Sequence, residues 1–294
     1  MQAYKFEHGR RYHAFQEGKY ALPNDDAEIF RLGGWLDEIV LFFGRGYKWR
    51  NHSSISDMIF FIVLTELQHR IWQLSLDSRL HLSPLPDPLR NVLDIGCGTG
   101  AWVIEFAEAH PDTRVIGVDL SPIQPSVVPP NVEFIVDDMT APWIFDHKFD
   151  YIHSRAITIG VKDWELLINE VWRYLEPGGW VEFQEYHAPF VSDDGTIERC
   201  PDFERWNKIL LEVARKAGTT LDAILQAPEL LEKRGFVGVD TASTKWPVGP
   251  WAKGRREKRI GDLCLRVGGM DRCASCSADL LTLCIRMLQA GSKV

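Results

Sequence analysis

Apolar and polar positions follow two alternating periods along the chain from residue 90 onward. Short, mostly apolar runs predict six buried strands, at 90–95, 115–119, 132–136, 149–153, 180–186 and 237–244. Apolar residues spaced three and four apart predict helices between them, over 101–109, 164–175 and 203–217. We expect one further strand at 246–251. Strands that alternate with helices are typical of a parallel α/β sheet.

The first of these strands ends in a glycine-rich turn, Asp94-Ile95-Gly96-Cys97-Gly98-Thr99-Gly100. Glycines at alternate positions let the backbone approach a ligand with no Cβ in the way, and the helix that follows begins with unpaired N–H groups. The spacing G-x-G-x-G differs from the G-x-G-x-x-G of nicotinamide and flavin binders. Taken alone, the turn leaves open another Rossmann-like binder or a glycine turn without a ligand.

Polar residues stand where the next strands end. Asp119 closes the second strand, where a carboxylate can accept two hydrogen bonds from vicinal ribose hydroxyls. Asp137 and Asp138 follow the third strand. His153 ends the fourth, and its ordinary pKa of about 6.5 suits a general base. A histidine there can equally hold a loop by hydrogen bonds, and Glu185 has the same two interpretations.

Composition and charge narrow the class of protein. The chain has 294 residues, 45% of them hydrophobic, and a net charge of -8, which predicts one large globular domain, with or without appendages, and argues against a general nucleic-acid binder. The apolar run Met58–Leu64 is too short to cross a bilayer, and Met1–Tyr20 is too polar for a signal peptide. Six cysteines in this length indicate reduced thiols rather than a disulfide framework, and hence a cytoplasmic or nuclear protein.

Two local features have a simple and a functional interpretation. Cys273 and Cys276, with Cys264 and Cys284, could form a zinc site, but one C-x-x-C with irregular flanks favours incidental cysteines and no metal. The basic run 253–259 could be a nuclear import signal, and a solvated charged loop is the favoured interpretation.

The turn at 92–100, with its acid two residues before the first glycine, resembles motif I of class I methyltransferases that use S-adenosylmethionine (SAM). Further segments are similar to the LaeA-like methyltransferases of filamentous fungi, which are regulators and tailoring enzymes of secondary metabolism. The resemblance covers residues 4–32 and 67–260. Its motifs are Gly-Arg-Arg-Tyr-His-Ala-Phe at 9–15, Tyr-Ala-Leu-Pro-Asn-Asp at 20–25, Asp-Leu-Ser-Pro-Ile-Gln-Pro at 119–125, Tyr-Ile-His-Ser-Arg at 151–155, Lys-Asp-Trp at 162–164 and Gln-Glu at 184–185.

The resemblance implies a Rossmann-like class I methyltransferase fold, an α/β sheet of seven mostly parallel strands with helices on both faces and a final antiparallel strand. An N-terminal helical or lid segment would occupy residues 1–89, the SAM-binding domain 90–252 and a divergent tail 253–294. Residues 33–66 interrupt the family's pattern and are interpreted as an insertion or a retained intron.

The same resemblance assigns site residues. Asp94 would face the ammonium group of SAM, Asp119 the ribose, and Asp138 with the Met139 N–H the adenine. Tyr12 and Tyr20 would belong to the lid, Arg155 would face the acceptor, and His153 and Glu185 would be catalytic. The full set expected at the cofactor is Tyr20, Asp94, Gly96, Cys97, Gly98, Gly100, Asp119, Leu120, Asp137, Asp138, Met139, His153 and Ser154.

Three functional hypotheses result. The first is a SAM-dependent methyltransferase of fungal secondary metabolism that acts on a small-molecule or protein acceptor, without nucleic-acid or membrane partners. The second is a regulatory subunit that keeps the fold and works by binding a velvet-type partner protein. The third is a gene-model variant whose insertion and altered tail prevent stable folding. O-, N- and C-methylation all suit the same scaffold.

Overall fold

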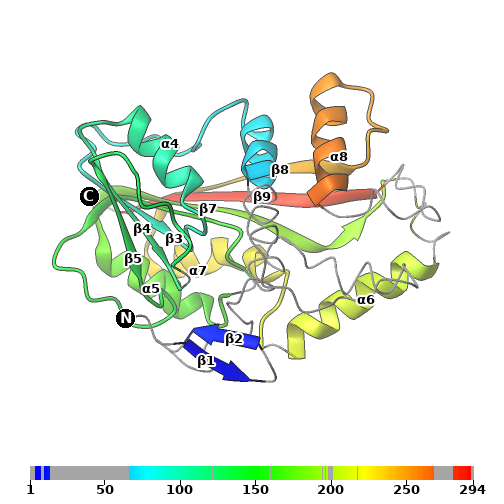
Figure 1. Ribbon diagram of the computed structural model, residues 1–294, viewed down its shortest axis with the longest axis horizontal. Helices are drawn as coiled ribbons and strands as arrows, with labels where there is room; N and C mark the ends of the chain where they lie inside the picture. The colour runs from blue at the N-terminus through cyan, green and yellow to red at the C-terminus, as the bar shows by residue number, and fades with distance from the viewer. Residues whose placement is uncertain are drawn as a thin grey trace. The chain divides into compact units, whose positions relative to one another are not determined.

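The computed structural model describes residues 4–7, 10–13, 66–120, 122–158, 160–193, 195, 197, 201–216, 218–267 and 281–292 (Figure 1). Strands β1 (Tyr4–Glu7) and β2 (Arg10–His13) form an antiparallel pair. The chain divides into two compact units, which we describe separately. One comprises residues 1–78, 190–209 and 245–283, and the other comprises 79–189, 210–244 and 284–294.

A sheet of seven strands has the order β5-β4-β3-β6-β7-β9-β8. Strand β3 pairs in parallel with both β4 and β6, β4 pairs in parallel with β5, and β6 with β7. This topology confirms the predicted Rossmann-like fold with a mostly parallel sheet. The strands are β3 (Asn91–Ile95), β4 (Arg114–Asp119), β5 (Val132–Val136), β6 (Phe149–Arg155), β7 (Leu175–Val191), β8 (Val237–Val248) and β9 (Leu281–Gly291).

The order of the strands reverses beside β3. The chain continues from β3 to β4 and β5 on one side, then crosses to β6 and β7 on the other. In open α/β sheets, ligands bind at such a switch point, outside the carboxyl ends of the strands. The glycine turn leaves β3 at this point, so the topology places it where a ligand site is expected.

Helices cover both faces of the parallel part of the sheet. Helix α4 (Ala101–Ala109) lies on one face, while α5 (Trp164–Tyr174) and α7 (Ala227–Arg234) lie on the other (Figure 1). Helices α5 and α7 bury their apolar side chains in one core cluster and α4 in another, and a fully buried Leu, Ile or Phe contributes roughly 1.5–3 kcal/mol. The predicted helices are confirmed to within two residues, with α6 at Pro201–Lys216.

Helix α5 ends at Tyr174, where β7 begins directly. Residues 177–179 therefore form an irregularity inside β7, and the pairing with β6 shifts there. Gly178 has a φ of 82°, and a Cβ on Gly179 would lie 2.8 Å from the Asp150 carbonyl oxygen. Glycine at both positions lets the chain pass from helix to strand without a loop.

The prediction of a separate strand at 246–251 is wrong. Strand β8 continues without a break to Val248 and ends before Gly249, whose φ is 106°. The seventh strand of the sheet is β9, which comes from the C-terminal segment that the resemblance implied to be a divergent tail. The sequence of this segment, with its Leu, Ile and Met residues, contains an apolar run that suits a strand. The domain boundaries after residues 89 and 252 stay predictions.

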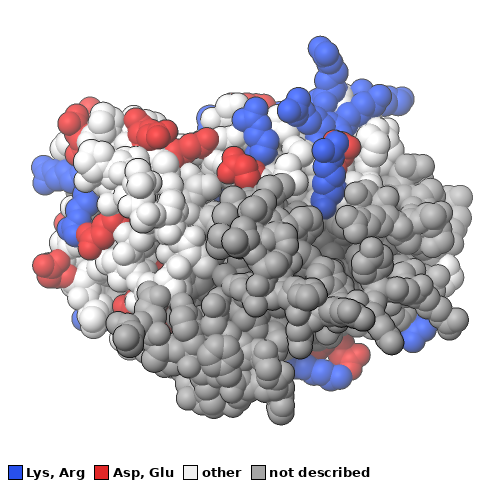
Figure 2. Space-filling model, in the orientation of Figure 1, with Lys and Arg blue, Asp and Glu red and all other residues white. Residues whose placement is uncertain are grey.

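The basic run is helical rather than a loop. In the first compact unit, α8 (Arg255–Val267) begins within it, and its basic side chains are exposed (Figure 2). Buried Ile260 and Leu263 give this helix an apolar face that the run of charges concealed. In the same unit, Arg256 pairs with Asp77 at 2.6 Å. Among the described residues, no helix is both long and apolar enough to cross a membrane.

Candidate functional site

The three glycines of the turn all have a positive φ, at 68° for Gly96, 56° for Gly98 and 81° for Gly100. A side chain at any of them would be strained. Their surroundings differ. A Cβ on Gly96 would lie 2.5 Å from Ile157 Cγ2, and one on Gly100 would clash with the Phe134 ring, whereas one on Gly98 would meet no atom of the described residues within 4 Å. Gly98 therefore presents bare backbone to open space, as a cradle for a ligand requires.

Asp119 is joined to this turn. Its Oδ2 accepts a hydrogen bond from the Gly98 N–H at 2.9 Å, while Gln124 Nε2 donates to the Gly98 carbonyl oxygen at 2.6 Å. The N–H groups of Gly96 and Cys97 donate to the carbonyl oxygen of Val118, at 2.8 and 3.0 Å. The end of β4 thus fixes the shape of the turn. Asp119, the residue predicted to bind the ribose, stands at the edge of the turn.

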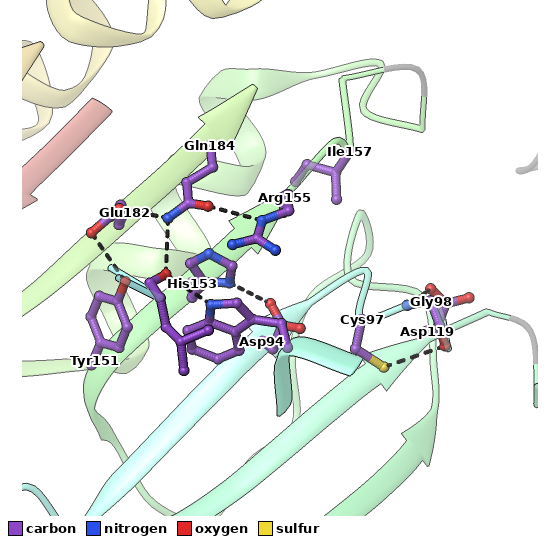
Figure 3. A network of polar contacts seen from close by, with 12 residues as sticks. Asp94, Cys97, Gly98, Asp119, Tyr151, His153, Arg155, Ile157, Glu182 and Gln184 are labelled. Carbon is purple, nitrogen blue, oxygen red and sulfur yellow. Dashed lines mark hydrogen bonds and ion pairs between the residues drawn. The ribbon is translucent and has the colours of Figure 1, made fainter. Parts of the chain in front are cut away.

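The electrostatic potential at the glycine turn is negative. The pKa of the Cys97 thiol is raised well above its ordinary value, first by burial and then by the charges of Asp119 and Asp94 (Figure 3). Both carboxylates therefore act on the glycine turn. A pyrophosphate would be repelled here, whereas a cationic ligand would be stabilised.

Asp94 does not stand alone at the end of β3. His153 Nδ1 lies 2.7 Å from Asp94 Oδ1, and the two side chains are 0% and 4% exposed. The imidazole stacks on Trp102, with ring centroids 3.8 Å apart and planes 4° from parallel. Burial, and then the charge of Arg155, lower the pKa of His153 well below its ordinary value. The imidazole is therefore neutral, and its Nδ1–H donates to the carboxylate.

A polar row crosses three neighbouring strands at this level. Asp94 on β3 stands opposite His153 on β6, which stands opposite Glu182 on β7 (Figure 3). Glu182 is completely buried and accepts hydrogen bonds from the Ser83 N–H at 2.8 Å and from the Tyr151 hydroxyl at 3.2 Å. Sequence reasoning missed Glu182, although a carboxylate inside an apolar run is a signal that it has buried partners.

Arg155 follows His153 on the same face of β6. Its Nε donates to Gln184 Oε1 at 2.9 Å, and Gln184 Nε2 donates to Glu182 Oε1 at 2.8 Å. Burial lowers the pKa of Arg155 to about 10, so the guanidinium stays charged at neutral pH. Arg155 thus extends the polar row towards the carboxyl end of the sheet.

The acids after β5 lie beside Asp119, because the Asp137 N–H donates to the Asp119 carbonyl oxygen at 3.2 Å. Asp138 is 3% exposed, and its Oδ1 accepts from the Thr140 N–H at 2.9 Å and from the Thr140 hydroxyl at 2.6 Å. Met139 is buried, and its carbonyl oxygen accepts from Trp143 Nε1 at 2.9 Å. The structure therefore brings the predicted ribose and adenine residues to one edge of the sheet.

The two residues predicted to be catalytic lie on opposite faces of the sheet, because side chains alternate along a strand. Glu185 is fully buried on the face opposite His153 and Glu182. It accepts hydrogen bonds from the Ile157 N–H at 2.8 Å, the Thr158 hydroxyl at 2.9 Å and the Thr158 N–H at 3.3 Å. Ser154, expected at the cofactor, shares this face and is also buried.

The remaining predicted residues are placed as follows. Leu120 is half-buried next to Asp119. Tyr12 lies in β2, and Tyr20 lies outside the described residues, as do Cys273 and Cys276. In the described part of the chain, no group of three His, Cys, Asp or Glu side chains could hold a metal ion.

Comparison with known proteins gives consistent matches. Residues 66–239 match the family described as a methyltransferase domain. The chain is 35% identical over 283 residues to "Methyltransferase pytC" of Aspergillus terreus, covering 96% of this chain and 77% of that protein. It is 35% identical over 197 residues to "Probable methyltransferase tdiE" of Emericella nidulans, covering 66% of this chain and 61% of that protein.

A third relative is "Protein-methionine methyltransferase laeA" of Emericella nidulans, 29% identical over 262 residues, covering 86% of this chain and 60% of that protein. Other laeA relatives are named secondary metabolism regulators. Among solved structures, the chain matches phosphoethanolamine N-methyltransferase 2 of Haemonchus contortus in complex with SAM, with a TM-score of 0.48 and 18% identity, covering 92% of this chain and 57% of that one.

Proposed function

The chain belongs to the methyltransferase-domain family, with LaeA-like proteins of filamentous fungi among its relatives, and from this premise we propose that it transfers a methyl group from SAM to a small-molecule or protein acceptor. The observation that carries the proposal is the charge on the glycine turn. Asp94 and Asp119 make it negative, and open space lies beside Gly98.

The residues present fit SAM rather than a dinucleotide. SAM carries a positive sulfonium and a positive ammonium group, which two carboxylates favour, whereas a pyrophosphate would be repelled. The bare backbone of Gly98 would accommodate the methionine half. Asp119 would accept hydrogen bonds from the ribose, and Asp138 with the Met139 N–H would hold the adenine. Bound SAM would supply an electrophilic methyl group for direct displacement by the acceptor.

The chain's own contribution to such a displacement is alignment and exclusion of water, which require no catalytic dyad. His153 and Trp102 hold the Asp94 carboxylate in one orientation, because the imidazole donates to it and stacks on the indole. The low pKa of His153 makes its imidazole a weak proton acceptor. We therefore assign His153 to orienting Asp94, which is one of the two roles that its sequence position left open.

Titration calorimetry of the purified chain with SAM and with S-adenosylhomocysteine tests the cofactor. We expect both to bind with micromolar dissociation constants, which correspond to a binding free energy of about −8 kcal/mol. Tritiated SAM, incubated with the chain and separated small-molecule and protein fractions of a fungal extract, then identifies the acceptor class. A folded chain that binds neither ligand would contradict the proposal.

The names of the relatives support a role in fungal secondary metabolism. Since several are named regulators of secondary metabolism and one is named a protein-methionine methyltransferase, the proposed acceptors include protein side chains as well as small molecules. A cytoplasmic or nuclear location belongs to this proposal. The velvet-type partner rests on the family resemblance alone.

A further inference from the structure

We propose that Glu185 is a positioning residue for the cofactor site, which holds the segment 156–158 so that Ile157 supports the glycine turn from behind. The inference rests on the proposed function, since it concerns the affinity for the same cofactor. It assigns to Glu185 a role through other residues, in place of direct contact with reacting atoms.

Glu185 binds the segment that follows β6. Its carboxylate accepts three hydrogen bonds, all from two consecutive residues that follow β6: the Ile157 N–H at 2.8 Å, the Thr158 hydroxyl at 2.9 Å and the Thr158 N–H at 3.3 Å. The side chain is 0% exposed, and among the described residues it forms no ion pair. A buried carboxylate is costly, and these three donors offset part of that cost.

Segment 156–158 contains a strained residue and is held by hydrogen bonds from several sides. Ala156 has a φ of 58°, a backbone conformation that is unfavourable for a residue with a Cβ. Its N–H donates to the Gln184 carbonyl oxygen at 3.0 Å, next to Glu185 in the chain. On the far side, the Thr219 hydroxyl donates to the Thr158 carbonyl oxygen at 2.9 Å. Such strain persists only where surrounding contacts impose it.

Ile157 connects this segment to the glycine turn. Ile157 packs against the core, and its Cγ2 lies directly beside Gly96. A Cβ added to Gly96 would be only 2.5 Å from this methyl carbon. Figure 3 shows Ile157 just beyond Arg155, at the end of β6 nearest the glycine turn. Gly96 is two residues from Gly98, the glycine that faces open space. The chain of contacts therefore runs from Glu185 through the Ile157 backbone to Ile157 Cγ2 and the glycine turn.

The test measures the dissociation constant of S-adenosylhomocysteine by titration calorimetry on the full chain at pH 8, where the Glu185 carboxyl, with its pKa of about 7, is ionised. Glu185→Gln keeps the volume but offers one acceptor oxygen and adds N–H groups opposite the segment's own donors. We expect its dissociation constant to rise about tenfold while the binding stoichiometry stays that of the wild type. Loss of folding alone would lower the stoichiometry instead. Glu232→Gln, the same change at an exposed position on α7, is the matched control.

Ile157 provides a second pair of variants that does not depend on Glu185. Ile157→Val keeps Cγ2 and should bind like the wild type, whereas Ile157→Ala loses it and should weaken binding about as much as Glu185→Gln. The double variant Glu185→Gln/Ile157→Ala should be no weaker than either single variant, because both break the same connection. If Glu185→Gln fails to fold, as judged by near-UV circular dichroism, the Ile157 pair decides.

The outcomes separate this inference from the proposed function. Wild-type binding that is retained in folded Glu185→Gln or in Ile157→Ala would overturn the positioning role and leave the cofactor assignment standing. Additive losses in the double variant would also overturn it, because the two residues would then act independently. A folded wild-type chain that does not bind S-adenosylhomocysteine would overturn both.

Discussion

His153 Nδ1 and Asp94 Oδ1 lie 2.7 Å apart on adjacent parallel strands, both side chains buried, with the imidazole stacked on Trp102. Since the carboxylate can only accept, this contact fixes the histidine tautomer with its proton on Nδ1. It also fixes the direction of an acid that stands two residues before the glycine turn. A residue predicted as a base and a residue predicted as a cofactor ligand are thus parts of one unit.

Asp94→Asn separates the charge of this unit from its hydrogen bond. The asparagine carbonyl still accepts from His153, so we expect a loss of stability of only about 1–2 kcal/mol in urea unfolding. Removal of the negative charge should weaken the binding of S-adenosylhomocysteine by about tenfold or more. Asp112→Asn, at an exposed position, is the control and should change neither quantity. Unaltered affinity in the Asp94 variant would refute an electrostatic role for this carboxylate.

Gly98→Ala tests the cradle. The φ of 56° makes alanine unfavourable by roughly 1–2 kcal/mol, but the space is open, so the variant should fold. Because its methyl group would project into the ligand's space, cofactor binding should be lost. Gly238→Ala, on β8, is the control. Gly238 has a φ of 61°, and an added Cβ would lie 3.6 Å from its nearest neighbour. This variant should lose similar stability without a change in affinity. Equal affinities for the two variants would show that Gly98 does not face the ligand.

Glu185 gives stability a specific dependence on pH. Burial raises its pKa to about 7, so the folded state holds the proton more tightly than the unfolded state does. This tighter binding of the proton stabilises the folded state fully below the unfolded pKa of about 4.3, and the stabilisation is lost as the pH rises through about 7. The total change in the free energy of unfolding is on the order of 3 kcal/mol. Urea unfolding between pH 5 and 8 measures it. In Glu185→Gln this loss of stability between pH 5 and 8 should be absent. Parallel curves of unfolding free energy against pH for the two proteins would contradict a raised pKa at Glu185.

The reactivity of the Cys97 thiol depends on its burial and on the negative charges near the glycine turn. Because burial, Asp119 and Asp94 raise its pKa, the thiol should resist alkylation by iodoacetamide at pH 8 in the folded chain. Asp119→Asn removes one of the charges and should increase the rate at Cys97 several-fold, measured by peptide mapping with mass spectrometry. Rapid modification of Cys97 in the folded wild type would mean that the turn is not shielded in this way.

The buried side chains of β7 show what the local sequence could not reveal. The run Val-Glu-Phe-Gln-Glu at 181–185 predicts a strand, and its alternation assigns Glu182 and Glu185 to opposite faces. Their partners come from elsewhere in the chain, Ser83 for Glu182 and Ile157 and Thr158 for Glu185. Since these contacts join residues far apart in sequence, no local pattern indicates which groups hold each buried carboxylate.

The sequence by itself determined the parallel sheet, the glycine turn and the acids at the ends of β3, β4 and β5, because hydrophobic period and turn chemistry are local properties. Only the tertiary structure decided that β9 completes the sheet, that Asp94 is bonded to His153, and that Glu185 faces away from it. These facts depend on strand order, register and burial. Such properties arise when distant segments pack together, and so they are not written in any one segment of the chain.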